Sequence, residues 1–407
     1  MLALALAVLL AHQAMVVSPA GPYRRLGDAV RVAPVGTVIT VRAGNYREPT
    51  VVIDRPLTIA GEPGAILDGE GVRELMVIAA PGVTVRGLTF RNTGSSHRED
   101  RAALRVRETS DCRLEQNRFE HTFFAIYLQA ATGCLVSDNV VEGRIGGEGN
   151  TGNGIHLWGS SRITLRNNEV RGHRDGIYLE FSRHAVVSGN TAEHNRRYGL
   201  HFMYSDSSAY SRNTFRENGT GVAVMFSGHV TMIGNSFVGN RGASAYGLLL
   251  KEISHSRLEA NRFVNNTTAL VADGASALEV VGNRFERNGR AVRLLASTSE
   301  GRFIGNSFVA NSFDVVVNSK GITTEFHRNW WDAYRGWDLD RDGVGDVAHH
   351  PVRLFSLLVE RSEPVLLLQR ALFVRLVDAA ERAVPALTPR TVLDPEPLMR
   401  PIAGGPR

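Results

Sequence analysis

Asparagine recurs through the middle of the chain at a nearly constant interval, and this repeat limits the possible folds more than any other feature. Ten asparagines are separated by 22, 29, 22, 23, 22, 26, 22, 23 and 23 residues. The two long intervals contain loop-like insertions at 144–154 and 241–247. A fixed period of this length indicates a solenoid of stacked repeats. The series is Asn117, Asn139, Asn168, Asn190, Asn213, Asn235, Asn261, Asn283, Asn306 and Asn329.

Other positions share this period. Alternating apolar stretches flank each asparagine, and three short strands per repeat are typical of one coil of a parallel β-helix. We therefore predict an all-β fold, a right-handed parallel β-helix with 22–23 residues in most coils and a C-terminal helical segment. Phenylalanines that follow the asparagine by two places are expected inside, at Phe215, Phe237, Phe263, Phe285 and Phe308. A second asparagine ladder is expected at Asn195, Asn218, Asn240, Asn266, Asn288 and Asn311.

The chain divides into three predicted parts. Residues 1–20 contain the apolar run LALALAVLL, which is too short to span a bilayer and is typical of a signal peptide, although the usual basic residues before it are missing. Residues 21–350 are the predicted β-helix domain. Residues 351–407 include a stretch with helical apolar spacing at 353–387, expected either to cap the open end of the β-helix or to dock on a partner. We expect an exported protein.

The predicted register places an unusual set of side chains on the outer surface, because alternate residues of a strand point outward. The two outward columns are Tyr127, His156, Tyr178, His201, Ala223, Leu249 and Gln129, Trp158, Glu180, Met203, Met225, Lys251. Met203 and Met225 would be neighbours on adjacent coils, with His201 beside them. Thioether and imidazole groups are the ligands that Cu(I) prefers. We expect a solvent-facing Cu(I) site at His201, Met203, Met225 and His156; a protein-docking patch is the alternative.

A second metal motif follows the last repeat. The run DLDRDGVGD (338–346) matches the first nine positions of a Ca²⁺-binding loop, in which alternating oxygens surround the ion and Gly343 permits the sharp turn. The twelfth position is His349 instead of glutamate. Either a structural calcium site or a simple Asp/Gly turn is expected. The calcium ligands would be Asp338, Asp340, Asp342, Val344 and Asp346.

The two cysteines are also separated by one repeat. Cys112 and Cys134 are 22 residues apart and fall in one inward column. Their Cα atoms would be close enough for a disulfide, but stacked side chains do not automatically reach the required dihedral angle. A stacked thiol pair and a disulfide both stay open, and export from the cytoplasm would permit the disulfide.

The charge distribution argues against a nucleic-acid partner. The formal net charge is +5, but the basic residues are almost all arginine, lysine occurs only at Lys251 and Lys320, and the arginines are spread along the chain. Recognition of nucleic-acid phosphates would need a basic stripe or patch. We therefore expect no nucleic-acid binding.

Three segments carry a resemblance to a known family. The runs NWWDAYRGWDLDRDGVGDVAHHPVRLFSLLVERS and FVRLVDAAERAVPALTPRTVLDPEPLMRP resemble the C-terminal signature of the NosD family, and AGNYREPTVVIDRPLTIAGEPGAILDG resembles its opening. The resemblance implies a periplasmic, non-enzymatic β-helix protein that works with an ABC-type ATPase and a membrane permease. It would supply copper, or a sulfur species, for maturation of nitrous oxide reductase. Membrane association through the permease, a copper chaperone and the reductase as further partners are also implied.

A polysaccharide-active enzyme is the alternative function, since lyases, glycosidases and epimerases share the β-helix fold and a fold does not settle function. The outward face offers Glu180 with Asp175, His173 and His201 nearby. A glycosidase requires two carboxylates at a defined separation, and the outward columns contain no repeated acidic pair. A scaffold or adhesin, the third class, would not need the methionine and histidine face.

Overall fold

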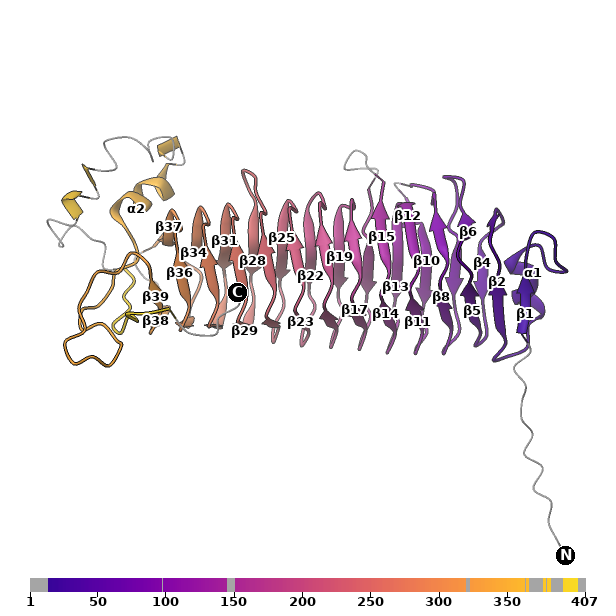
Figure 1. The fold of residues 1–407 in the computed structure, drawn as a ribbon, viewed down its shortest axis with the longest axis horizontal. Helices are drawn as coiled ribbons and strands as arrows, with labels where there is room; N and C mark the ends of the chain where they lie inside the picture. The colour runs from indigo at the N-terminus through magenta and orange to yellow at the C-terminus, as the bar shows by residue number, and fades with distance from the viewer. Residues whose placement is uncertain are drawn as a thin grey trace, which may run out of the picture.

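The computed structural model describes residues 14–96, 98–144, 151–319, 323–362, 364–365, 376–377, 379–381 and 391–401. Within these ranges the chain winds into a long solenoid with three faces, which are parallel sheets of 14, 12 and 13 strands (Figure 1). Each coil adds one strand to each sheet, and successive strands of a sheet are therefore one repeat apart in the sequence. The predicted parallel β-helix is confirmed.

The strands are grouped here by sheet. The 14-stranded sheet contains β1 (Ala14–Val17), β2 (Val38–Val41), β5 (Thr58–Gly61), β8 (Thr84–Arg86), β11 (Arg113–Glu115), β14 (Leu135–Ser137), β17 (Thr164–Arg166), β20 (Val186–Ser188), β23 (Ala209–Ser211), β26 (Thr231–Ile233), β29 (Ser254–Glu259), β32 (Ser276–Val281), β35 (Arg302–Ile304) and β38 (Glu325–His327). The 12-stranded sheet contains β4 (Val51–Ile53), β7 (Met76–Ile78), β10 (Ala102–Arg107), β13 (Phe124–Gln129), β16 (Ile155–Trp158), β19 (Asp175–Glu180), β22 (Tyr198–Met203), β25 (Thr220–Met225), β28 (Tyr246–Lys251), β31 (Thr268–Asp273), β34 (Arg290–Leu294) and β37 (Phe313–Val317). The 13-stranded sheet contains β3 (Gly44–Tyr46), β6 (Ala65–Asp68), β9 (Thr89–Arg91), β12 (Arg118–Thr122), β15 (Val140–Gly143), β18 (Glu169–Arg171), β21 (Thr191–Glu193), β24 (Thr214–Arg216), β27 (Ser236–Val238), β30 (Arg262–Val264), β33 (Arg284–Glu286), β36 (Ser307–Val309) and β39 (Trp330–Trp331).

The two predicted asparagine ladders run along the solenoid. In the longer ladder, the backbone N–H and the side-chain amide of one asparagine both donate to Oδ1 of the asparagine one coil later, at 2.8 and 3.0 Å between Asn190 and Asn213. The Asn190 amide also donates to the backbone carbonyl of Leu165 on the preceding coil. Every ladder member from Asn117 to Asn329 is buried. These buried polar groups are satisfied, and they fix each coil against the next.

The predicted phenylalanine column lies in the interior. The rings from Phe215 to Phe308 are fully buried, and neighbouring ring centroids are 5.5, 4.4, 4.9 and 5.0 Å apart. Trp331 extends the column, with its ring 4.1 Å from that of Phe308. Each buried ring contributes about 1.5–3 kcal/mol relative to an exposed one, so this column is a main source of stability.

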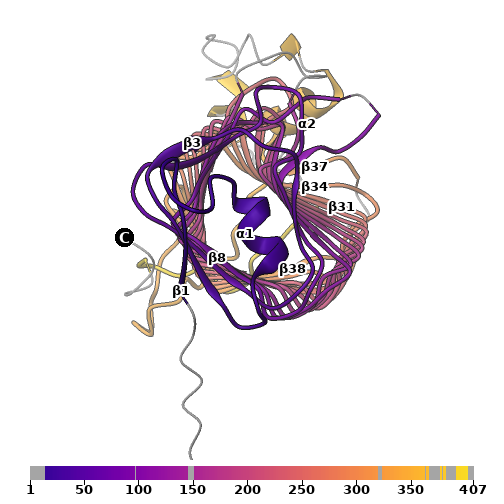
Figure 2. The same ribbon diagram turned by 90° about the vertical axis from the view of Figure 1, so that its right-hand side faces the viewer.

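The two ends of the solenoid differ. Helix α1 (Leu26–Val32) lies across the N-terminal opening of the bore (Figure 2), and the carboxylate of Glu48 accepts from the backbone N–H groups of Leu26 and Gly27 at its start. Residues 1–13 of the predicted signal peptide lie outside the described residues, while Ala14–Val17 form strand β1. The cleavage site therefore stays a prediction. None of the helices among the described residues is long and apolar enough to span a bilayer.

The cysteines form a disulfide in this structure. Cys112 and Cys134 are buried on neighbouring coils, with their Cα atoms 4.5 Å apart. Of the two arrangements that the sequence leaves open, the structure shows the bonded one. The bond joins consecutive coils of the 14-stranded sheet near β11 and β14.

Helix α2 (Leu354–Arg361) covers the outward side of the last coil (Figure 1). Its Phe355 packs on Phe313 of β37, with the ring centroids 5.9 Å apart, and Glu360 accepts from Arg293 of β34 at 2.8 Å. The helix thus lies against the side of the solenoid and not over its end. Most of the rest of 353–387 lies outside the described residues, so the docking role stays a prediction.

The segment 391–401 caps the longer ladder instead. Asp394 is fully buried, and its Oδ2 accepts from the backbone and side-chain amides of Asn329 at 3.0 and 3.1 Å and from Nε1 of Trp331 at 3.0 Å. Its backbone pairs with that of His349. The carboxylate therefore takes the place that the oxygen of an eleventh asparagine would occupy, from a position 65 residues further along the chain.

The second ladder also ends on a carboxylate. The side chain of Asn311 donates to Oδ1 of Asp314 at 3.2 Å. Burial raises the pKa of Asp314 to about 7, against an ordinary value of 3.8. The folded protein therefore holds a proton on Asp314 at pH values where the unfolded chain has released it.

Replacing Asp394 by alanine should destabilise the C-terminal coils, because three buried donors lose their acceptor at a cost of about 1–3 kcal/mol each. We expect faster amide hydrogen exchange in β36, β38 and β39, and a smaller effect for Asp394→Asn, which keeps one oxygen. Glu396→Ala is the control, since the exposed Glu396–Arg328 pair contributes at most about 1 kcal/mol. Equal exchange in wild type and Asp394→Ala would show that the cap is dispensable.

Because the pKa of Asp314 is raised, the sign of the pH dependence of the free energy of unfolding can be stated. Between pH 4 and pH 7 the folded state binds the additional proton, so the contribution of Asp314 to the free energy of unfolding falls as pH rises through this window. Asp314→Asn cannot ionise and should gain stability over wild type by on the order of 2–4 kcal/mol between pH 5 and pH 8, measured by urea unfolding. Asp54→Asn, which removes an exposed acid, serves as the control. Parallel pH curves for wild type and Asp314→Asn would contradict the assignment.

Candidate metal sites

The predicted register of the outward face is confirmed. In the 12-stranded sheet, Tyr178 pairs with His201 and Met203 pairs with Met225 on adjacent strands. His156 pairs with Tyr178 one coil earlier. The structure therefore places the two methionines side by side and places His201 two residues before Met203 on β22. The side chains of both methionines are partly exposed.

The histidines of this face are less accessible than the sequence predicts. His156 is 5% and His201 is 4% exposed, because each ring is stacked between neighbours in an outward column. The ring centroids of Tyr127, His156, Tyr178 and His201 follow one another at 4.7, 4.8 and 4.5 Å. Since the Tyr178 ring separates the two imidazoles, His156 does not join His201 in one ligand set. The prediction of solvent-facing imidazoles was wrong.

Both imidazoles have carboxylate neighbours. Nδ1 of His201 lies 3.5 Å from Oδ2 of Asp175, and Nε2 of His156 lies 3.7 Å from Oε2 of Glu180. These contacts are longer than ordinary hydrogen bonds, and within the described part of the chain the four buried ring nitrogens have no well-formed hydrogen bond. Buried polar atoms left in this state need an explanation such as a bound ion or water.

The thioether of Met203 also has a polar neighbour. The hydroxyl of Tyr178 donates to Sδ of Met203 at 3.6 Å. Burial raises the pKa of Tyr178, so the phenol keeps its proton and acts as a donor. The nearby His156 imidazole holds the pKa of Glu180 below its ordinary range, which keeps a negative charge beside this column.

The donor set fits a soft cation. Two thioethers on strands about 4.8 Å apart can approach one ion, and His201 adds an imidazole nitrogen on the same strand as Met203. Oxygen-seeking ions such as Ca²⁺ or Mg²⁺ would not choose these atoms. The residues at the predicted position therefore match Cu(I) in chemistry, with His156 as a member of the supporting ring stack.

Three exposed aromatic rings border the methionines. Phe181, Tyr204 and Phe226 directly follow Glu180, Met203 and Met225, and their ring centroids are 5.3 and 5.1 Å apart. All three residues have a positive φ of 50–51°, as the turn after each strand requires. Sequence reasoning missed this row, although the one-coil spacing of the three residues was a usable signal.

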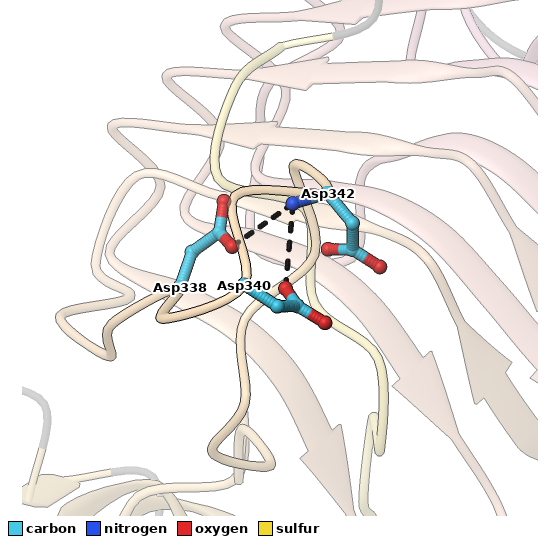
Figure 3. Close-up of side chains that lie close together, drawn as sticks. All are labelled: Asp338, Asp340 and Asp342. Carbon is cyan, nitrogen blue, oxygen red and sulfur yellow. Dashed lines mark hydrogen bonds between the residues drawn. The ribbon is translucent and has the colours of Figure 1, made fainter.

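The acidic loop gathers three of its predicted ligands. One carboxylate oxygen from each of Asp338, Asp340 and Asp342 lies within 4.8 Å of the other two (Figure 3). The loop is held by backbone N–H groups that donate to these side chains, from Asp342 to Asp338 at 3.2 Å and from Val344 to Asp342 at 2.7 Å. Gly343 has φ +87°, a conformation that side chains rarely adopt.

Asp346 and His349, at the ninth and twelfth positions of the loop motif, have different surroundings. Asp346 turns back across the loop and accepts from the backbone N–H of Leu339 at 2.7 Å. His349, at the twelfth position, packs on the ring of Trp331 with the centroids 5.1 Å apart, and burial lowers its pKa to about 4. His349 therefore belongs to the C-terminal cap and does not replace the missing glutamate.

Comparisons with known proteins agree with the resemblance that the sequence carries. A family model described as "Periplasmic copper-binding protein (NosD)" matches residues 143–336. A protein of Pseudomonas aeruginosa named "Probable ABC transporter binding protein NosD" is 36% identical over 386 residues, covering 90% of this chain and 88% of the relative. A protein of the same name from Stutzerimonas stutzeri is 31% identical over 381 residues, covering 88% of this chain and 86% of the relative.

Solved structures show likeness in fold alone. An alginate lyase, AlyF-OU02 in complex with G6, superposes with a TM-score of 0.51 at 14% identity, covering 76% of each chain. The tailspike protein 3 of bacteriophage CBA120 gives a TM-score of 0.50 at 11% identity, covering 76% of this chain and 56% of the tailspike. Sequence identity over nearly the whole length is found with the NosD proteins, and the chain therefore belongs to the NosD family.

Proposed function

We propose that this protein is a periplasmic, non-enzymatic subunit that binds Cu(I) at Met203, Met225 and His201 and passes it on. Its copper, or a sulfur species carried in its place, would serve the maturation of nitrous oxide reductase, together with an ABC-type ATPase and a permease. The family description and the names of the relatives support the general role. The matched residues 143–336 include all three ligands.

The pairing of Met203 with Met225 is the observation that carries this proposal. Exposed thioethers are unusual on a β-sheet surface, and here two of them pair on adjacent strands beside a buried histidine whose Nε2 has no hydrogen-bond partner among the described residues. A site with few ligands at a partly exposed surface suits an ion that must be transferred to another protein. The donor or acceptor would be a copper chaperone or the reductase itself.

The enzymatic alternative is weakened by the state of the nearby carboxylates. Asp175 is fully buried and paired with Arg197, and Glu180 lies against His156. Neither carboxylate is free to act as the second acid of a glycosidase. An assay with alginate and other polysaccharides, run on the same preparation as the copper titration, tests this alternative directly. Turnover without copper binding would favour an enzyme.

We also propose that the loop at 338–346 binds Ca²⁺ as a structural ion. Asp338, Asp340 and Asp342 place their oxygens together, and the backbone carbonyl of Val344 and the side chain of Asp346 are the further ligands expected from the motif. The loop touches the cap, because Gly345 donates to the carbonyl of Pro397 at 2.8 Å. Calcium binding would therefore stabilise the C-terminal end and would be independent of copper.

The double change Met203→Leu with Met225→Leu should lower Cu(I) affinity by at least about tenfold, because leucine keeps the volume and removes the sulfur donors. Thermal stability should change little, since these side chains are partly exposed. A competition titration against a Cu(I) chelator measures the affinity. Met399→Leu, a partly exposed methionine in the C-terminal segment, is the matched control. Unchanged affinity in the double variant would place the site elsewhere.

Calcium removal should lower the melting temperature of the wild type, because only the folded loop binds the ion. At 100 times the dissociation constant, the stabilisation lost would be about 2.7 kcal/mol. Asp340→Ala should start at the lower melting temperature and show no response to calcium. Asp54→Ala, which removes an exposed acid outside the loop, should respond like the wild type. If the wild type shows no response, the motif is only a turn.

A further inference from the structure

Asp175 is a buried acid, and the strand that contains it gives no reason for a carboxyl group at this position. It begins β19, is 0% exposed, and its Oδ1 accepts from Nε of Arg197 at 2.8 Å. The guanidinium of Arg197 forms an ion pair with this carboxyl group and donates to both of its oxygens, from Nε to Oδ1 and from Nη2 to Oδ2. The side chain is therefore a carboxylate, which can accept hydrogen bonds and cannot donate them.

The second oxygen of this carboxylate faces an imidazole. Oδ2 of Asp175 lies 3.5 Å from Nδ1 of His201, while the Tyr178 and Tyr198 rings flank the imidazole at 4.5 and 4.7 Å between centroids. Arg197 also lies over the Tyr198 ring, at 4.9 Å. The ring of His201 is thus stacked on Tyr178 and lies against the tilted Tyr198 ring, and its Nδ1 edge faces an acceptor.

We propose that Asp175 is a positioning residue that keeps His201 in the tautomer protonated at Nδ1. Because a carboxylate can only accept, it favours a proton on Nδ1 across this 3.5 Å contact, and Nε2 keeps its lone pair. A neutral histidine whose other nitrogen donates to a carboxylate is the usual arrangement for a metal ligand. This inference rests on the proposed copper site, in which Nε2 of His201 would be the nitrogen ligand. Arg197 fixes the carboxylate, and Asp175 fixes the imidazole.

The chain contains its own control in the same column. His156 also lies beside a carboxylate, but there the facing nitrogen is Nε2, 3.7 Å from Oε2 of Glu180. The same reasoning assigns His156 the tautomer protonated at Nε2. Two histidines with similar burial and stacking are therefore expected in opposite tautomers, and a role of Asp175 as a mere ion-pair partner for Arg197 would not produce this difference.

The test measures the tautomers in the full-length, metal-free protein. Long-range ¹H–¹⁵N NMR of ¹⁵N-histidine-labelled protein above pH 8, where free imidazoles are neutral, distinguishes the two forms, and His201→Gln and His156→Gln assign the signals. We expect the Nδ1–H form for His201 and the Nε2–H form for His156. In Asp175→Asn the Nδ1–H population of His201 should fall. His201 in the Nε2–H form in the wild type overturns the proposal, even where the variant does not fold.

Copper binding provides the second readout. Asp175→Asn should lower Cu(I) affinity by about 10–100-fold, as loss of the group that orients a metal-bound histidine does. Glu180→Gln is the matched variant, and it should alter the signals of His156 while leaving the tautomer of His201 in place. An Asp175→Asn protein with wild-type tautomer and wild-type Cu(I) affinity would refute the positioning role. The expected tautomers with no Cu(I) binding in the wild type would instead refute the proposed function and leave the carboxylate–imidazole contact standing.

Discussion

The hydrogen bond from one asparagine to the next is the interaction on which the rest of the structure depends. In the longer ladder, each amide from Asn117 to Asn306 is buried and bonds both the next asparagine and the backbone of the preceding coil, so a slip of one residue would leave polar groups unsatisfied inside the solenoid. The ladder thereby determines which residues of neighbouring coils face each other. The pairing of Met203 with Met225, and the stacking of Tyr178 on His201, follow from this register.

Insertions leave the ladder undisturbed. Asn139 and Asn168 are 29 residues apart, yet the Asn139 amide still donates to Oδ1 of Asn168 at 2.9 Å. Additional residues can therefore leave the solenoid at a turn while the strands stay aligned. The face that bears His201, Met203 and Met225 can acquire neighbouring loops without loss of the strand pairing that brings these residues together.

The sequence predicts those features of the fold and site that repeat. Period and alternation were sufficient for the parallel β-helix, the phenylalanine column, both ladders and the methionine pair. They were not sufficient for the burial of His156 and His201, because an outward direction does not show that aromatic neighbours will cover the ring. They also could not identify Asp394, which belongs to no repeat and reaches Asn329 through the three-dimensional fold alone. The chemistry of Asp175 became visible only once Arg197 and His201 were placed around it.

The side-chain amides within each ladder are aligned, so that their dipoles point in one direction. Each side-chain amide points its carbonyl oxygen toward the N-terminal end of the solenoid and its N–H group toward the C-terminal end, as in the donation from Asn306 to Asn329. Aligned amide dipoles of this kind add up, as the peptide dipoles of an α-helix do. In these ladders the positive end is the C-terminal end of the solenoid, whereas in an α-helix it is the N-terminus. An aspartate accepts from the last amide in each case: the Asp394 carboxylate for the longer ladder, and for the other Asp314, whose pKa is raised by burial to about 7. The last side-chain amide of each ladder is thereby bonded within the chain, and it is not available as a donor to the first coil of a second molecule.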